Sequence, residues 1–174
     1  MVEVSKLNFK RLSFWKVVFA ILFLAIPGFI LPSKLVIGYG DSVKYTLFWK
    51  VSKDEFSYDD YVVLKMPKED PFAKGMNIVK RVGCKEGDEL LIEGKAYYCL
   101  RKGEGKAIFL GEAKERTRTG VKVNQFNPCS DNPCRVRVPS GHIFVIGDHK
   151  DSYDSRYFGW VPYERVIVVA KPIF

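Results

Sequence analysis

The sequence predicts a mainly β protein in which one N-terminal transmembrane helix precedes an antiparallel, partly closed β-domain. An apolar run fills residues 12–31, and the chain beyond it consists of short β-branched or aromatic runs bounded by Gly, Pro, Asp and Asn. Aromatic residues make up 14% of the chain, which suits a β-rich core. Beyond the apolar run, no long segment carries the stripe of apolar residues that an amphipathic helix requires.

The first 11 residues are expected to form a basic cytoplasmic flank. The formal net charge is +8, and Lys6, Lys10 and Arg11 are opposed in this segment by Glu3 alone. A basic flank before an apolar run places the N-terminus inside the cell and the following domain outside. We therefore expect a single-pass protein of the bacterial inner (cytoplasmic) membrane, with residues 32–174 in the periplasm or outside.

Residues 12–31 are expected to form the transmembrane anchor. Twenty residues in a helix rise roughly 30 Å, which is the thickness of the hydrocarbon core of a bilayer. Lys16 is the only charge and lies near the start, where its side chain can reach the headgroups. A cleaved signal peptide is the alternative, but no small-x-small cleavage pattern is evident near residues 27–33. An anchor that stays attached is therefore favoured.

The domain at residues 32–174 is predicted to consist of short strands. Residues 102–132 are charged, rich in glycine and weakly periodic, so we expect a charged excursion or long hairpin there. The predicted strands cover residues 44–51, 60–66, 77–82, 89–92, 96–100, 136–138, 142–146 and 165–170.

All four cysteines follow the anchor, on the side of the membrane where disulfides persist. Cys84 and Cys99 flank an apparent hairpin, and Cys129 and Cys134 can close a small ring in a loop rich in Pro and Asn. We prefer the pairs Cys84–Cys99 and Cys129–Cys134 among the three connectivities. Free buried thiols remain an alternative, and zinc is a weaker one because the chain has no CxxC pair.

Composition argues against several other kinds of protein. Two histidines are too few for most zinc enzymes, and neither a GxxxxGK[ST] loop nor a GxGxxG turn is present, so we expect no metal and no cofactor. The basic residues beyond the flank alternate with acids and are not interleaved with aromatic residues. We therefore expect no nucleic-acid partner.

A serine nucleophile needs a base within hydrogen-bonding distance, and three side chains are candidates for that base. His142 lies in an apparent strand and His149 in a polar loop, so both are expected to be structural or solvated. Lys80 lies in the apolar strand NIVKRV and can act as a base only if burial lowers its pKa. By its residues alone, Lys80 is better explained as an ordinary solvated strand lysine than as a base.

A resemblance to a known family favours Lys80. Residues 138–162 resemble the signature of the type I signal peptidases, or leader peptidases, although one residue fewer separates Asp148 from Ser152 than in many members. Residues 59–67 and 78–90 resemble a strand of that family and its lysine-bearing strand, and the motifs follow in the family's order. The resemblance implies a β-domain of the signal peptidase type with a Ser/Lys dyad. The matching signature residues are Gly147, Asp148, Ser152, Asp154, Ser155, Arg156 and Gly159.

Ser42 is the serine that this resemblance implies as the nucleophile. The family's usual Ser-Met-x-Pro element is missing, and the segment around Ser42 is more similar to the TraF-type pilin maturation peptidases of conjugative transfer. Ser33, at the expected membrane surface, is the alternative nucleophile. Many leader peptidases carry a hydroxyl two residues before the nucleophile as part of the oxyanion hole, whereas this chain has Gly40.

The resemblance also implies roles and partners. Lys80 would act as the base and Ser152 would orient it, while Asp154 and Arg156 would form a supporting ion pair. The substrate would be an exported precursor or a pilin, whose acyl group would pass to water or to the substrate's own amine, which cyclises it. The partners would include the lipid bilayer and a conjugative transfer or secretion complex. A general type I signal peptidase and an inactive membrane-anchored scaffold are the alternatives.

Overall fold

The computed structural model describes residues 14–23, 33–52, 56–117, 120–129 and 131–173. The chain divides into two compact units, Met1–Leu35 and Val36–Phe174. In the first unit, residues 14–23 are helical, and the other residues of the expected anchor, 12–13 and 24–31, lie outside the described part. No helix within the described residues is both long and apolar enough to cross a membrane.

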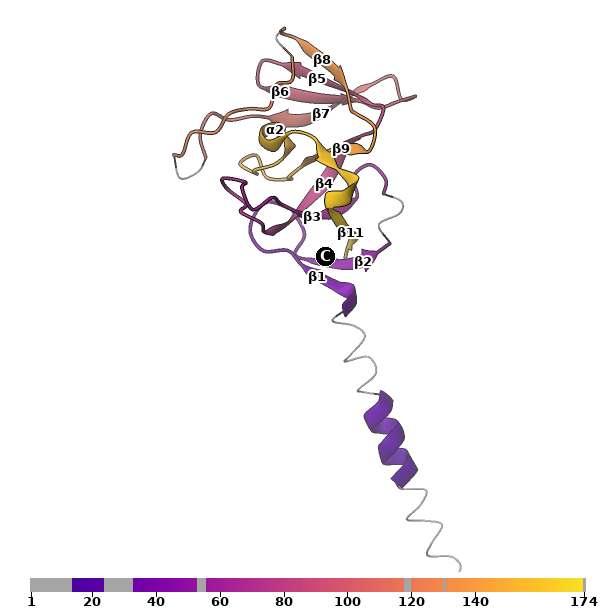
Figure 1. Cartoon of the computed structure of the whole chain (residues 1–174). Coiled ribbons are helices and arrows are strands. Elements are labelled where there is room, and N and C mark those ends of the chain that lie inside the picture. The colour runs from indigo at the N-terminus through magenta and orange to yellow at the C-terminus, as the bar shows by residue number, and fades with distance from the viewer. Residues whose placement is uncertain (1–13, 24–32, 53–55, 118–119, 130, 174) are drawn as a thin grey trace, which may run out of the picture. The chain divides into compact units, whose positions relative to one another are not determined.

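The second unit contains two sheets (Figure 1). The first has seven strands in the order β1-β2-β11-β3-β4-β9-β10, and every neighbouring pair from β2 to β10 is antiparallel. Its strands are β1 (Leu35–Ile37), β2 (Leu47–Val51), β3 (Tyr61–Lys65), β4 (Asn77–Lys85), β9 (His142–Ile146), β10 (Val161–Pro162) and β11 (Val166–Pro172).

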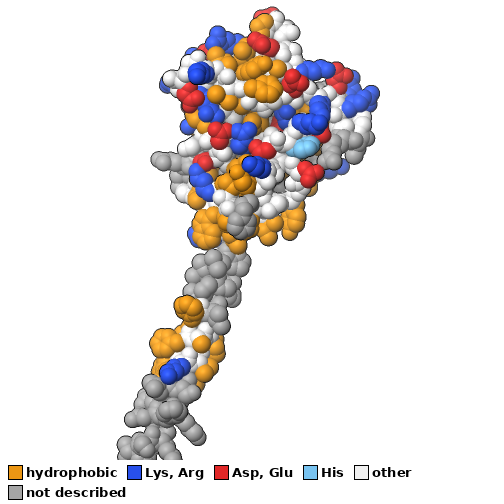
Figure 2. Space-filling model, turned by 180° about the vertical axis from the view of Figure 1, so that it is seen from behind, with side chains coloured by type: hydrophobic (Ala, Val, Ile, Leu, Met, Phe, Trp, Pro, Cys, Tyr) orange, Lys and Arg blue, Asp and Glu red, His pale blue; other side chains and the backbone are white. Residues whose placement is uncertain are grey.

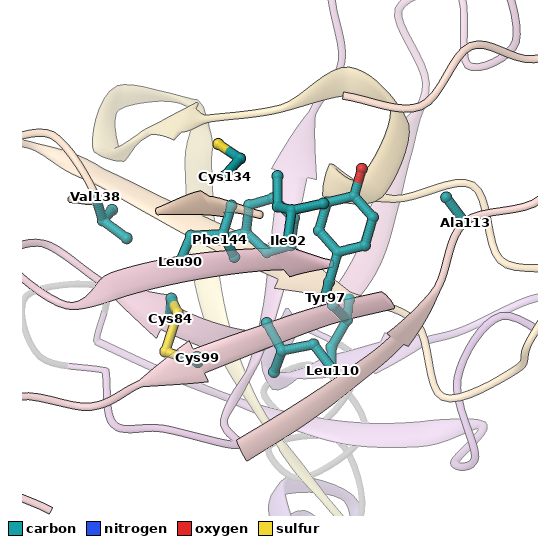
Figure 3. Close-up of a cluster of buried hydrophobic side chains, with 11 residues drawn as sticks. Cys84, Leu90, Ile92, Tyr97, Cys99, Leu110, Ala113, Cys134, Val138 and Phe144 are labelled. Atoms are coloured by element: carbon teal, nitrogen blue, oxygen red, sulfur yellow. A yellow bond between two sulfur atoms is a disulfide. The ribbon is translucent and has the colours of Figure 1, made fainter. Parts of the chain in front are cut away.

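The second sheet has four antiparallel strands in the order β7-β6-β5-β8. They are β5 (Glu89–Glu93), β6 (Ala96–Leu100), β7 (Ala107–Glu112) and β8 (Cys134–Arg137). The inward-facing side chains of this sheet, among them Leu90 and Tyr97, pack with Phe144 of β9 in one buried cluster (Figure 3). A four-residue helix, α2 (Ser155–Phe158), and a 3-10 turn, Tyr163–Arg165, complete the elements described in this unit.

The expectation of a mainly β, antiparallel domain is confirmed, and each predicted strand overlaps an observed one. Strands β1, β7 and β10 and helix α2 are additional. Strand β7 lies inside the segment expected to be a charged excursion, where it forms a hairpin with β6. Its alternation is short, because Ile108 and Leu110 are its inward aliphatic residues and the register between β6 and β7 shifts at Leu110, between the pairs Tyr98–Phe109 and Tyr97–Gly111.

Strand β4 connects the two sheets. It lies between β3 and β9 in the first sheet, and an irregularity at Gly83 separates its two halves. Beyond that point Cys84 enters the buried cluster of the second sheet and bonds to Cys99 of β6 (Figure 3). A β-bulge of this kind re-aims side chains, so one strand can carry a polar group at one end and a core residue at the other.

Both preferred disulfides are present. Cys84 is bonded to Cys99, and Cys129 is bonded to Cys134. No cysteine of the chain is free, so neither the thiol alternative nor the zinc alternative applies to these residues.

Candidate active site

Three side chains from distant parts of the chain meet at the amine of Lys80. Its Nζ atom donates hydrogen bonds to Oγ of Ser42 at 2.8 Å and to Oγ of Ser152 at 2.9 Å. The two hydroxyl oxygens lie 3.3 Å apart. Ser42 lies in the turn before β2, Lys80 in β4, and Ser152 in the loop after β9. The residues that the sequence associates with this chemistry are therefore in mutual contact.

Lys80 is buried without a directly bonded carboxylate among its described contacts. Only 3% of the residue is exposed, and burial lowers its pKa from 10.5 to about 8. The charge of Asp154 opposes this shift and that of Arg156 adds to it, both less strongly than burial. An amine with this pKa is neutral in about a tenth of molecules at pH 7 and in about half at pH 8, far more than an exposed lysine. It can therefore accept a proton from a serine hydroxyl.

Gly147 allows Ser152 to approach this amine. A Cβ atom at position 147 would lie 1.9 Å from Oγ of Ser152 and 2.8 Å from the backbone oxygen of Ser42. Contacts this short do not occur, and one of them involves backbone that cannot move aside. Any side chain at this position would displace both serines from Lys80.

Asp148 holds the turn that carries Ser42, which we call the Ser42 turn (residues 40–44). The N–H of Asp148 donates to the backbone oxygen of Ser42 at 2.8 Å, and its Oδ2 atom accepts from the N–H of Lys44 at 2.9 Å. A single residue thus holds the backbone of the turn at Ser42 and at Lys44. The sequence places Asp148 in the signature but assigns it no role, because these contacts span about a hundred residues of chain.

Asp154 and Arg156 form a buried ion pair within the Gly147–Gly159 loop. Their side chains are joined by two hydrogen bonds, Nε to Oδ1 at 2.8 Å and Nη2 to Oδ2 at 2.7 Å, and both residues are fully or almost fully buried. Asp154 also accepts from the N–H of Gly147 at 2.8 Å and from the N–H of Arg156 at the start of α2. Arg156 reaches the backbone oxygen of Glu112 in β7 at 2.7 Å. The pair therefore ties the Gly147–Gly159 loop to the second sheet.

The rings of the two candidate histidines bond to backbone groups, and the backbone N–H of His149 also donates to the backbone oxygen of Ser42 at 3.4 Å. The ring of His142 is bonded to the backbone of Ser140, and the ring of His149 accepts from the N–H of Asp151. Ser33 is exposed and belongs to the first unit. Gly40 has a φ of +87°, and a Cβ there would meet nothing within 4 Å. Glycine therefore suits the backbone at this position, and the space beside it is open.

A buried amine shared by two serine hydroxyls is the arrangement of a serine nucleophile with a lysine base. The sequence model of the family described as "Signal peptidase, peptidase S26" matches residues 13–174. The chain belongs to this family, as the resemblance in its motifs implies.

Individual relatives match smaller parts. A signal peptidase I from Bacillus caldolyticus is 28% identical over 125 residues, 66% of this chain and 63% of that protein. A conjugal transfer protein TraF from Agrobacterium tumefaciens is 46% identical over 37 residues, 21% of each chain. This chain therefore matches less than two thirds of the length of either relative. A solved signal peptidase I from Enterococcus faecalis is 21% identical, with a TM-score of 0.39. The superposition includes 67% of this chain and 97% of the solved chain.

Proposed function

We propose that this protein is a membrane-anchored serine endopeptidase that cleaves exported precursor proteins with a Ser42/Lys80 dyad. The observation that carries the proposal is the buried Nζ atom of Lys80, within 2.9 Å of the hydroxyls of Ser42 and Ser152. Membership of the signal peptidase family supports the same chemistry.

The reaction follows from the geometry. Neutral Lys80 takes the hydroxyl proton of Ser42 while Oγ of Ser42 attacks the scissile carbonyl carbon. The tetrahedral intermediate collapses, the C–N bond breaks, and the Lys80 ammonium returns the proton to the leaving amine. Water, or an amine of the same substrate, then attacks the acyl carbon while Lys80 takes its proton, the ester bond to Ser42 breaks, and Lys80 returns the proton to Oγ of Ser42. Ser152 accepts a hydrogen bond from Nζ throughout, which keeps the amine aimed at Ser42.

The substrate is proposed to bind as an extended segment along β4. Strand β9 pairs with β4 from Arg81 onward, and within the described residues no strand pairs with Asn77–Lys80 on that side. An unpaired strand edge binds an extended peptide through backbone hydrogen bonds. An edge that ends at Lys80 delivers the bound peptide to Ser42.

The proposed location is the bacterial inner membrane, with the second unit on the outer side. Strands β1 and β2 lie at the edge of the first sheet and bear exposed apolar side chains, Ile37 at 58% exposure and Trp49 at 38%. Tyr39, just beyond β1, is 89% exposed. Phe48, in contrast, is fully buried and packs in the core beside Tyr61. On the face drawn in Figure 2, charged side chains of both signs are interspersed on the second unit.

Two substrate classes fit this proposal. The match to a conjugal transfer protein TraF supports pilin maturation for conjugative transfer, which includes cyclisation as one outcome of acyl transfer. The longer match to a signal peptidase I supports removal of secretory signal peptides. Complementation of a strain depleted of its leader peptidase separates them, because only a general signal peptidase restores growth.

The decisive experiment measures precursor processing in membranes that contain the wild-type protein, Ser42→Ala or Ser33→Ala. We expect Ser42→Ala to abolish cleavage while membrane insertion and folding are retained, and Ser33→Ala to cleave like the wild type. Cleavage by Ser42→Ala would refute the assignment of the nucleophile. Normal assembly of a transfer complex with Ser42→Ala would instead support the scaffold alternative.

A further inference from the structure

The two faces of β4 carry different parts of the site. Lys80 lies opposite Val62 of β3, and Arg81 lies opposite Tyr61. Cross-strand partners in an antiparallel sheet project from the same face. Arg81 and Tyr61 therefore lie side by side on the face that Lys80 does not use.

Both side chains of that second face reach the same carboxylate. The hydroxyl of Tyr61 donates to Oδ2 of Asp148 at 2.7 Å, and Nε of Arg81 donates to Oδ1 at 2.9 Å. Oδ2 is also the atom that accepts from the N–H of Lys44 in the Ser42 turn. The carboxylate of Asp148 thus links the hydroxyl of Tyr61 to the backbone of the Ser42 turn.

Tyr61 contacts the same segment a second time, through its ring. The ring centroid lies 5.1 Å from that of Phe48 and 5.8 Å from that of Tyr45, in the stretch of chain that follows the Ser42 turn. Only 5% of Tyr61 is exposed. Burial, and then its hydrogen bond to Asp148, raise the pKa of Tyr61, so its hydroxyl keeps its proton throughout the working pH range.

Arg81 is less exclusively bound to Asp148. Its guanidinium also pairs with Asp59, and 28% of its side chain is exposed. The Arg81–Asp148 ion pair is partly open to water, which weakens it, whereas Tyr61 donates its hydrogen bond to the same carboxylate from a side chain that is almost fully buried. Of the two donors, Tyr61 is therefore the one that can fix the orientation of the Asp148 carboxylate.

We propose that Tyr61 is a positioning residue for the nucleophile, and that its hydroxyl orients Asp148 so that Asp148 holds the Ser42 turn in reach of Lys80. This inference rests on the proposed peptidase function. It assigns Tyr61 no contact with the substrate and no proton transfer. Its effect is confined to the geometry of the attack by Ser42.

The test compares Tyr61→Phe with Tyr58→Phe. Each variant keeps the aromatic ring and removes one hydroxyl that donates to a carboxylate. The hydroxyl of Tyr61 donates to Asp148 at 2.7 Å, and that of Tyr58 donates to Asp88 at 2.8 Å. Steady-state cleavage of a precursor peptide by the full-length protein gives kcat and KM. We expect Tyr61→Phe to lower kcat about tenfold with KM unchanged, and Tyr58→Phe to leave both unchanged.

Amide hydrogen exchange gives a readout that does not depend on activity. Tyr61→Phe should speed exchange at the N–H groups of Lys44 and Asp148, and Tyr58→Phe should not. In an Asp148→Asn background, Tyr61→Phe should add little further loss of kcat, because the shared partner is already altered.

Unchanged exchange at these two amides, equal losses of kcat in the two tyrosine variants, or additive losses in the Asp148→Asn background would each overturn the proposal. A wild-type protein that cleaves no better than Ser42→Ala would contradict the peptidase function instead. In that case the exchange data still decide whether Tyr61 holds the turn.

Discussion

The chemistry of Lys80 is determined by its surroundings, because nothing in the residue itself distinguishes it from a surface lysine. Alternation in the strand predicts only that Lys80 and Arg81 lie on opposite faces. Burial at 3% exposure lowers the pKa of Lys80, whereas Arg81 on the other face is paired with two carboxylates. The two adjacent basic residues therefore differ in charge behaviour. Lys80 can become neutral, whereas Arg81 remains a cation.

Lys80→Met should raise the stability of the folded protein at pH 7. In the unfolded chain this lysine titrates near 10.5, and in the folded protein near 8. Below pH 8 both states are charged and the folded state carries the full penalty of burying the charge. The penalty shrinks as the pH rises from 8 to 10.5 and is absent above that range.

The shift corresponds to an upper limit of about 3 kcal/mol, part of which is offset by the two serine hydrogen bonds that the variant loses. Chemical denaturation of the wild type and Lys80→Met at pH 7 and pH 10 measures the effect. A gain of roughly 1–3 kcal/mol at pH 7 that diminishes at pH 10 is expected. Equal stabilities at pH 7 would show that Lys80 is not buried as a costly charge.

The site was partly predictable at this scale. Ordered motifs led to Ser42, Lys80 and Ser152, whose side chains the structure brings together. Tyr61 carried no signal, because a tyrosine in a β-strand is ordinary and its partner Asp148 lies 87 residues away. Such contacts depend on strand register between β3 and β4 and on the path of a loop, and neither can be read from a single segment.

At the scale of elements, strands with clear alternation and turn residues at both ends were predictable. Strands β3, β5, β6 and β9 fall within one residue of their expected bounds. Helix α2 was not, since four residues are too few for a helical pattern, and its start is set by the side chain of Asp154, which caps Arg156. Short elements of this kind form because tertiary contacts hold them.

The disulfides are expected to contribute unequally. Loop-closure entropy alone gives roughly 3 kcal/mol for the 15-residue separation of Cys84 and Cys99, and roughly 2 kcal/mol for the 5-residue separation of Cys129 and Cys134. Cys84 and Cys99 are also fully buried in the cluster of Figure 3, so their replacement leaves a cavity.

Thermal unfolding of the Cys84→Ala/Cys99→Ala and Cys129→Ala/Cys134→Ala double variants tests this ranking. We expect the first double variant to unfold at the lower temperature. A larger loss in the second would mean that the loop ring, and not the link between β4 and β6, dominates.

At the scale of the whole molecule, β4 connects the candidate active site to the hydrophobic cores of both sheets. Its first half carries Lys80 in the first sheet, and its second half carries Cys84 into the core of the second. The Asp154–Arg156 pair joins the loop of Ser152 to β7 of that second sheet. Both partners of Ser42 are thus held by rigid structure, which catalysis by precise positioning requires.

The central claim is that a neutral Lys80 is the base for Ser42, and the dependence of kcat/KM on pH tests it most directly. Measured from about pH 6 to 10, the logarithm of kcat/KM should rise with a slope of about one up to about pH 8, the pKa of Lys80, and then level off. Lys80→Met and Lys80→Arg should both be inactive, because neither side chain can accept the proton. An acid limb that disappears in His142→Gln or His149→Gln, or substantial activity in Lys80→Met, would contradict the account.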